Sequence, residues 1–266
     1  MTPGSTLARA FGVSAGVVAA ALIVVLVSSR ASSATSPVEV SKHLPAPPAP
    51  ALHVPRPVAL RRAPTVAYWA SVRSAVSGRV WPSNSSAVVA PLATTTPEDT
   101  TNIVLVLGRA RDRAGRLWVH VRLPVLPNDR TAWVPRSALG VYGAVQTHLI
   151  IDLERLTATL LRKGSAIFRA PIGVGRPEWP TPKGDFYIRD EVVRYKSAFY
   201  GPLAFGTSAL SSVLTDWPGG GFIGLHGTNE PELVPGRISH GCVRFRNRDI
   251  LELGRLMQVG TPVTIR

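Results

Sequence analysis

The chain contains a single cysteine, Cys242, within the run SHGCVR at residues 239–244. It follows His226 by sixteen residues, and His226 lies in the run GLHGT at residues 224–228. A lone thiol cannot form an intramolecular disulfide, so Cys242 is a buried spectator, an intermolecular bridge, a metal ligand or a reactive thiol. The neighbouring glycines and the histidines His226 and His240 favour a reactive thiol, because glycine allows close backbone approach and imidazole accepts a thiol proton.

Two kinds of chemistry fit these residue types. The pKa of a free thiol is about 8.5, and only the thiolate attacks carbonyl carbon well. A nearby imidazole would therefore either lower that pKa or accept the thiol proton. By residue type alone, His226 or His240 can do this. The alternative is a zinc site that uses His226, His240 and Cys242. The absence of a paired Cys-x-x-Cys or His-x-x-x-His element from the sequence counts against zinc.

The spacing of these motifs resembles the catalytic domain of the YkuD-family L,D-transpeptidases. The resemblance rests on HGT at residues 226–228 and SHGCVR at residues 239–244, joined by a region with two prolines. Three further segments support it, at residues 150–153, 172–175 and 181–188. The similarity extends over nearly all of residues 144–266.

The resemblance implies a cysteine peptidyl transferase that acts on peptidoglycan stem peptides. Such an enzyme cleaves after the third residue of a tetrapeptide stem and releases D-alanine. Cys242 is expected to be the nucleophile and His226 the proton acceptor and donor, with the carbonyl of Gly227 orienting the imidazole. His240 would shape the pocket, and the N–H groups around Gly241 and Cys242 would hold the oxyanion. No cofactor or metal is expected.

Two further residues of the motif each have two interpretations. Ser239 either forms a hydrogen bond near the nucleophile or satisfies a turn. Arg244 either receives a substrate carboxylate, to which its planar fork is suited, or is a solvated surface arginine.

The sequence leaves open which molecule accepts the acyl group. An amine acceptor gives a cross-link, whereas water gives L,D-carboxypeptidase activity. A non-catalytic wall-binding protein is an alternative of a different class. The expected partners are stem peptides, as donor and acceptor, with no obligate protein partner.

The formal net charge of +14 does not point to nucleic acid, because the arginines are scattered and no aromatic-basic cluster recurs. An anionic envelope polymer or a membrane surface fits this charge. A general preference for arginine over lysine is the alternative explanation.

Residues 1–30 are predicted to form a membrane anchor or signal segment. The apolar run at 10–27 is flanked by Arg9 and Arg30, and it is long for a signal peptide and close to the minimum for a spanning helix. These lengths favour an uncleaved transmembrane helix, while the small residues at 32–34 permit cleavage and secretion. Residues 31–64 read as a Pro/Ala/Ser-rich linker in an extended conformation. The predicted location is the bacterial cell envelope, outside the cytoplasm.

Residues 65–143 are predicted to form a small SH3-like β-barrel. Short β-like runs at 103–107 and 117–121 are separated by turn residues, and the part from 117 to 139 resembles the end of a bacterial SH3-like domain. His120, Trp118 and Trp133 are interpreted as packing residues of strands.

Residues 144–266 are predicted to form the catalytic β-sandwich with one short helix. Runs at 148–152 and 157–161 predict a hairpin, with the next turn at residues 163–164. The helix is expected to begin at Asn247 as N-cap and to be ended by Gly260. A closing strand is predicted over 262–265. The fold class is therefore mainly β: a YkuD-like sandwich, an SH3-like barrel before it and an N-terminal helix.

Overall fold

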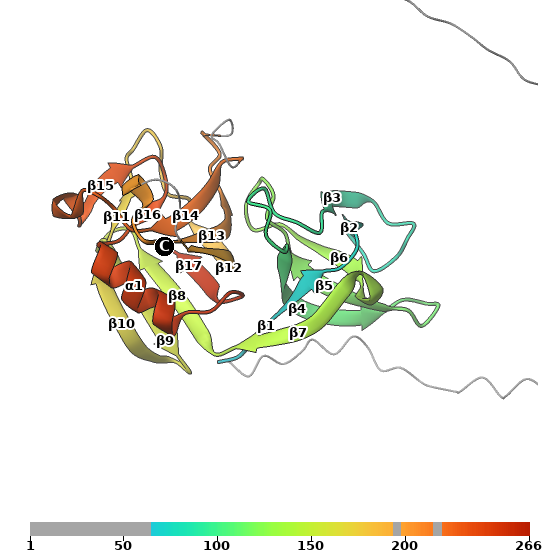
Figure 1. Ribbon diagram of the computed structural model, residues 1–266. Helices are drawn as coiled ribbons and strands as arrows, with labels where there is room; N and C mark the ends of the chain where they lie inside the picture. The colour runs from blue at the N-terminus through green and yellow to red at the C-terminus, as the bar shows by residue number, and fades with distance from the viewer. Residues whose placement is uncertain (1–64, 194–197, 215–219) are drawn as a thin grey trace, which may run out of the picture. The chain divides into compact units, whose positions relative to one another are not determined.

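The computed structural model describes residues 65–193, 198–214 and 220–266. The predicted anchor or signal segment and the predicted linker lie outside these residues. Within the described ranges, no helix is both long enough and apolar enough to cross a membrane. The described chain is mainly β with one α-helix, as predicted from the sequence (Figure 1).

The first sheet is antiparallel and has seven strands in the order β3-β2-β6-β5-β4-β1-β7. The strands are β1 Ala67–Val72, β2 Val76–Arg79, β3 Val88–Leu92, β4 Ile103–Arg111, β5 Leu117–Arg122, β6 Thr131–Pro135 and β7 Leu139–Val145, with a short 3-10 helix at Arg136–Ala138. The predicted runs at 103–107 and 117–121 fall within β4 and β5. The short β-like runs between turn residues therefore predicted these two strands correctly. The SH3-like barrel stays a prediction.

His120, Trp118 and Trp133 pack within this sheet. Trp118 is buried and donates from its ring nitrogen to Asp112 at 3.0 Å. The ring of His120 stacks on that of Trp133 at a centroid distance of 4.8 Å, and its Nε2 contacts the Thr131 hydroxyl. These contacts agree with their interpretation as packing residues.

The second sheet has ten strands in the order β10-β9-β8-β17-β12-β13-β14-β16-β11-β15. They are β8 Thr147–Asp152, β9 Thr157–Arg162, β10 Ser165–Pro171, β11 Gly173–Gly175, β12 Gly184–Val193, β13 Leu203–Leu210, β14 Phe222–His226, β15 Gly236–Ser239, β16 Val243–Arg244 and β17 Pro262–Ile265. Two short 3-10 helices lie at Ala198–Tyr200 and Pro231–Leu233. The predicted β8–β9 hairpin and the closing strand at 262–265 are confirmed.

The helix α1 spans Asn247–Leu256 and packs its buried residues Ile250 and Leu253 against the second sheet. Gly254 allows β13 to approach α1 closely, because a Cβ there would overlap the side chain of Leu203.

The predicted ends of α1 were wrong. The N-cap is Arg246, and the helix ends before Met257, so Gly260 lies in the turn that leads to β17. Asn247 does not cap α1 because its side-chain oxygen accepts a hydrogen bond from the N–H of Thr228 instead, at 2.9 Å.

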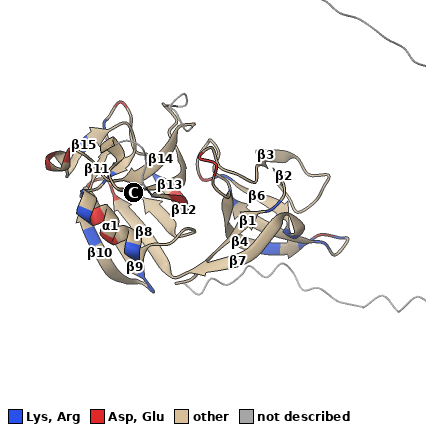
Figure 2. Cartoon of the chain, viewed as in Figure 1, with Lys and Arg blue, Asp and Glu red and all other residues tan. Residues whose placement is uncertain are grey.

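Both sheets belong to one compact unit. Tyr187 of β12 is fully buried beside Ile103 and Leu105 of β4, and its hydroxyl donates to the carbonyl of Ile103 at 3.0 Å. The side chain of Asn128 pairs with both backbone groups of Leu210 in β13. Basic residues are distributed over both sheets (Figure 2).

Candidate active site

His226 is the last residue of β14 and its side chain is only 2% exposed. Its Nδ1 lies 2.6 Å from the carbonyl oxygen of Gly227. Since a carbonyl only accepts, Nδ1 carries the hydrogen in this contact and Nε2 of the neutral ring holds the lone pair. Burial lowers the pKa of His226 to about 4, with a further lowering from Arg244 and an opposing effect of the Gly227 contact. At neutral pH the imidazole is therefore uncharged and able to accept a proton at Nε2.

Cys242 lies immediately before β16, which pairs in parallel with β14. In this register Leu225 faces Val243 and His226 faces Arg244, so Cys242 lies beside Gly224. The N–H of Gly224 donates to Sγ at 3.3 Å. A Cβ placed on Gly224 would be 3.8 Å from Sγ and 3.9 Å from Cδ2 of His226. The pairing of two short strands thus brings the predicted nucleophile and the predicted base to the same face of Gly224.

The Cys242 thiol is half-buried, and burial raises its pKa above the usual value. The Gly224 N–H and the positive charge of Arg244 oppose this rise. Of the two roles considered for the imidazole, lowering of the thiol pKa does not fit a neutral His226, which supplies no positive charge. The other sequence-based role of the imidazole, as proton acceptor, is compatible with this state.

The turn before Cys242 is held by Ser239 and Thr181. The Ser239 hydroxyl donates to the carbonyl of Cys242 at 2.6 Å and accepts from the N–H of Gly241 at 3.1 Å. The buried Thr181 hydroxyl donates to the carbonyl of Gly241 at 2.7 Å and accepts from the N–H of Gly175. Gly241 has φ of 116°, in a region that favours glycine.

These contacts bear on two of the sequence-based expectations. The hydroxyl of Ser239 bonds within the turn and also to the backbone of Cys242, which fits both of its interpretations. The N–H of Gly241 is already bonded to Ser239, so the prediction that it holds an oxyanion is not met in this arrangement. The sequence analysis did not predict a role for Thr181. This residue appeared there only as the first residue of the segment 181–188, which supports the family resemblance.

Arg244 is 4% exposed, so the interpretation as a solvated surface arginine is wrong. One of its terminal nitrogens lies 3.0 Å from the carboxylate of Glu230, and its guanidinium lies over the ring of Phe199 at 4.3 Å from the centroid. Its Nε is buried and has no hydrogen-bond partner among the described residues. A buried donor without a partner leaves room for a further acceptor.

One pocket collects the predicted residues and several aromatic side chains. It is lined by Phe199, Tyr200, Ser211, Leu214, Gly221, Phe222, Ile223, His226, Ser239, His240, Cys242 and Arg244. The Tyr200 ring meets that of His226 edge-on at 4.7 Å between centroids. Sequence reasoning missed the aromatic residues, because no local pattern shows that the 3-10 helix at Ala198–Tyr200 lies against β14.

His240 is exposed at the rim of this pocket and contacts Trp179, with 4.3 Å between ring centroids. This place fits a residue that shapes the pocket. Within the ranges that the structure describes, no group of three or more His, Cys, Asp or Glu side chains is arranged to hold a metal ion. The side-chain geometry therefore does not support the zinc alternative.

Comparison with known proteins places this site in a recognised domain. Residues 146–265 match the family model YkuD, the L,D-transpeptidase catalytic domain. The chain is 34% identical over 118 residues to the Bacillus subtilis protein named as L,D-transpeptidase YkuD, a match that covers 44% of this chain and 65% of the relative. The protein of the same name from Bacillus licheniformis is 33% identical over 117 residues, covering 44% and 64%. The chain thus spans slightly less than two thirds of the curated relatives it matches.

A solved structure of an L,D-transpeptidase from Mycobacterium tuberculosis is also similar. It is 15% identical, and the match covers 62% of this chain and 90% of that chain with a TM-score of 0.39.

Proposed function

We propose that residues 146–265, which match the YkuD L,D-transpeptidase catalytic domain, transfer acyl groups between peptidoglycan stem peptides through Cys242. The donor is a tetrapeptide stem, cleaved after its third residue with release of D-alanine. The observation that carries the proposal is the position of the Cys242 thiol and the neutral His226 imidazole beside Gly224, in one pocket.

Acylation begins with both groups uncharged. Nε2 of His226 takes the proton of the Cys242 thiol while Sγ attacks the carbonyl carbon of the third stem residue. A C–S bond forms, and an electron pair of the carbonyl moves to its oxygen. The carbonyl of Gly227 holds the Nδ1–H and stabilises the imidazolium that results. Since the N–H of Gly241 is bonded to Ser239, we assign the oxyanion to the N–H of Cys242 itself.

The tetrahedral intermediate then collapses. The C–N bond to D-alanine breaks, and the imidazolium of His226 donates its proton to the departing amine, which leaves a thioester on Cys242. An amine of an acceptor stem attacks the thioester carbonyl carbon and loses a proton to His226. The new C–N bond forms, the C–S bond breaks, and the imidazolium of His226 returns the proton to Sγ, which restores the thiol. If water attacks instead, the product is a tripeptide stem and the enzyme is an L,D-carboxypeptidase.

Arg244 is proposed to bind a carboxylate of the donor. Its guanidinium is buried at the pocket that holds Cys242, and its Nε has no partner among the described residues. A planar guanidinium binds a carboxylate through two parallel hydrogen bonds, which fixes orientation as well as affinity.

The rest of the chain is proposed to deliver this domain to its substrate. We propose the domain bounds 1–30 for the anchor or signal segment, 31–64 for the linker, 65–143 for the SH3-like domain and 144–266 for the catalytic domain. The envelope outside the cytoplasm is the compartment where stem peptides occur, so the same proposal places the protein there.

The test is D-alanine release from a disaccharide-tetrapeptide by the full chain, with Cys242→Ala as the comparison. Release by the wild type that is lost in Cys242→Ala supports the proposal. A cross-linked dimer among the products indicates transfer, and a tripeptide alone indicates carboxypeptidase activity. No release by the wild type, together with binding to purified peptidoglycan, would favour the wall-binding alternative.

A further inference from the structure

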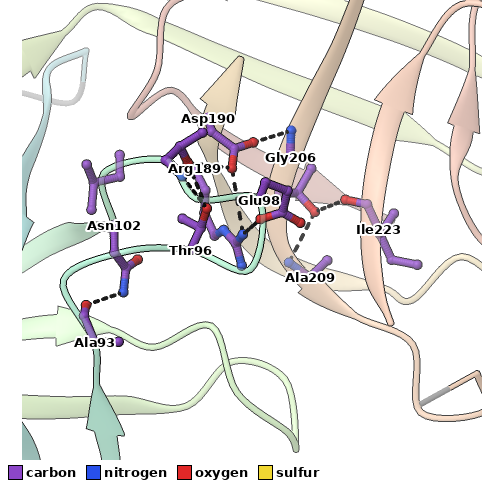
Figure 3. Close-up of polar contacts among 12 residues, drawn as sticks. Ala93, Thr96, Glu98, Asn102, Arg189, Asp190, Gly206, Ala209 and Ile223 are labelled. Carbon is purple, nitrogen blue, oxygen red and sulfur yellow. Dashed lines mark hydrogen bonds and ion pairs between the residues drawn. The ribbon is translucent and has the colours of Figure 1, made fainter. Parts of the chain in front are cut away.

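Arg189 links the first sheet to the wall of the catalytic pocket. It lies in β12 and is 2% exposed, and its guanidinium is 2.8 Å from the carboxylate of Glu98 (Figure 3). Glu98 belongs to the loop 93–102 between β3 and β4 of the first sheet. The other carboxylate near the guanidinium, that of Asp190, is farther away at 3.7 Å. Glu98 is therefore the closer of the two anions at a buried cation.

The loop that carries Glu98 is closed by its own hydrogen bonds. The side chain of Asn102 donates to the carbonyl of Ala93 across the base of the loop at 2.8 Å (Figure 3). The hydroxyls of Thr96 and Thr100 lie 2.8 Å apart, and the N–H of Thr96 donates to the carbonyl of Thr100. Such cross-loop bonds order the loop on both sides of Glu98.

The same guanidinium lies over the ring of Phe222, 3.8 Å from its centroid. Phe222 is the first residue of β14, the strand that ends at His226, and it lines the pocket that contains Cys242. A desolvated cation over an aromatic ring is attracted to the negative face of that ring. The position of this part of the pocket wall therefore depends on where the guanidinium of Arg189 is held.

A second series of contacts leads from the same loop to Cys242. The Thr100 hydroxyl donates to Asp190 at 3.1 Å, and the other oxygen of Asp190 accepts from the N–H of Gly206 at 2.9 Å. Gly206 is opposite Gly224 in the pairing of β13 with β14, and the N–H of Gly224 donates to Sγ of Cys242. A Cβ at Gly206 would overlap the Asp190 carboxylate, so this contact requires glycine.

From these contacts we propose that the loop 93–102 positions the donor-binding wall of the catalytic pocket, with Glu98 acting through Arg189 on Phe222. This rests on the proposed transferase function and adds a positioning residue from outside the catalytic domain. Removing the charge of Glu98 leaves the buried guanidinium with the more distant Asp190. The guanidinium then moves toward that carboxylate and off the ring of Phe222.

The test compares Glu98→Gln with Asp99→Asn in the full chain. Asp99 is the next residue of the loop, is exposed and has φ of 59°, which asparagine tolerates, so it is a matched control. Because a displaced Phe222 changes the wall of the pocket, we expect Glu98→Gln to raise KM for the disaccharide-tetrapeptide about tenfold. Its kcat changes less than KM, and Asp99→Asn behaves as the wild type.

A second readout does not depend on the transferase reaction. The rate of alkylation of Cys242 by iodoacetamide should increase about twofold or more in Glu98→Gln, because a displaced Phe222 exposes the half-buried thiol. In a Phe222→Leu background, Glu98→Gln should have little further effect on either readout, since the ring through which it acts is gone. Thr100→Val, which breaks the second series of contacts, is the reserve variant if Glu98→Gln does not fold.

The outcomes separate the two proposals. If the wild type does not turn over the donor but the alkylation rates follow the expected pattern, the transferase proposal fails and the positioning role stands. If the wild type turns over the donor while Glu98→Gln matches Asp99→Asn in both readouts, the positioning role is refuted. Fully additive effects of Glu98→Gln and Phe222→Leu would also refute it.

Discussion

At the scale of single residues, the protonation of His226 and Cys242 governs the chemistry. Burial lowers the pKa of the imidazole to about 4 and raises that of the thiol, so both groups are neutral at pH 7. This differs from a cysteine protease in which thiolate and imidazolium form an ion pair before the substrate binds. In the proposed mechanism, proton transfer therefore accompanies attack on the carbonyl.

This protonation state predicts the pH dependence of Cys242 alkylation. The thiolate fraction increases with pH until the thiol pKa is passed, and that pKa is raised above its usual value of about 8.5. The rate of reaction with iodoacetamide, followed by mass spectrometry, should therefore still be increasing at about pH 9. A plateau of the rate between about pH 5 and 7 would show an ion pair and contradict the account.

Arg244 gives a second prediction at this scale. Arg244→Lys keeps the positive charge but loses the planar fork, so kcat/KM for the tetrapeptide donor should decrease about tenfold to a hundredfold. Arg248→Lys is the control, because Arg248 is exposed on α1. An Arg244→Lys variant with unchanged kcat/KM would show that the guanidinium binds no donor carboxylate.

At the scale of elements, the site depends on the parallel pairing of β14 with β16 and on a link from α1. Thr228, two residues after His226, is fully buried, and its N–H donates to the side chain of Asn247 at the start of α1. The segment 226–228 also carries the Gly227 carbonyl that fixes the imidazole tautomer. The helix therefore holds the segment that orients the base.

Asn247→Ala tests this link. The variant leaves the buried N–H of Thr228 without its partner, which should lower the free energy of unfolding by about 1–3 kcal/mol. The donor kcat should decrease as well, because the Gly227 carbonyl is less firmly placed. Urea unfolding and steady-state kinetics measure both effects, with Glu252→Ala on the exposed face of α1 as control. Equal stability of the two variants would contradict the proposed link.

The helix and the hairpins show what local sequence patterns predict well. The helix expected from Asn247 onward is present, and the runs at 148–152 and 157–161 correctly predicted the hairpin of β8 and β9. The N-cap was wrong because asparagine has a high capping propensity, but here a tertiary contact with Thr228 takes its side chain.

The residues of the candidate site also differ in whether a local sequence pattern marks them. The motifs around Cys242 and His226 marked both residues as candidates, and the structure places both at one pocket. The parallel strands that bring them together follow from the fold rather than from any local pattern. Thr181 and Tyr200 come from distant segments with no such motif, so only the tertiary structure assigns them to the site.

At the scale of the whole molecule, the two sheets are joined by hydrogen bonds and by buried side chains. Asn128, in the turn before β6, donates to the carbonyl of Leu210 at 2.8 Å and accepts from its N–H at 3.0 Å. The side-chain amide of Asn128 thus satisfies both backbone groups of Leu210, the last residue of β13, as a residue of a neighbouring strand would. Together with the buried Tyr187, this contact makes the first sheet part of the support for the catalytic sheet.

Asn128→Ala should therefore destabilise the molecule. The variant removes both hydrogen bonds to Leu210, and we expect the free energy of unfolding to decrease by about 1–3 kcal/mol. The matched control is Asn84→Ala in an exposed turn of the first sheet. Denaturant unfolding measures the difference, and a variant as stable as Asn84→Ala would show that this contact adds nothing to stability.

The most direct test of the central claim is intact-protein mass spectrometry of the full chain after brief incubation with a disaccharide-tetrapeptide. The account predicts an added mass equal to the donor minus D-alanine, located on Cys242, absent from Cys242→Ala and strongly reduced in His226→Ala. Equal adduct on the wild type and on Cys242→Ala, or D-alanine release by Cys242→Ala at the wild-type rate, would contradict a Cys242 thioester.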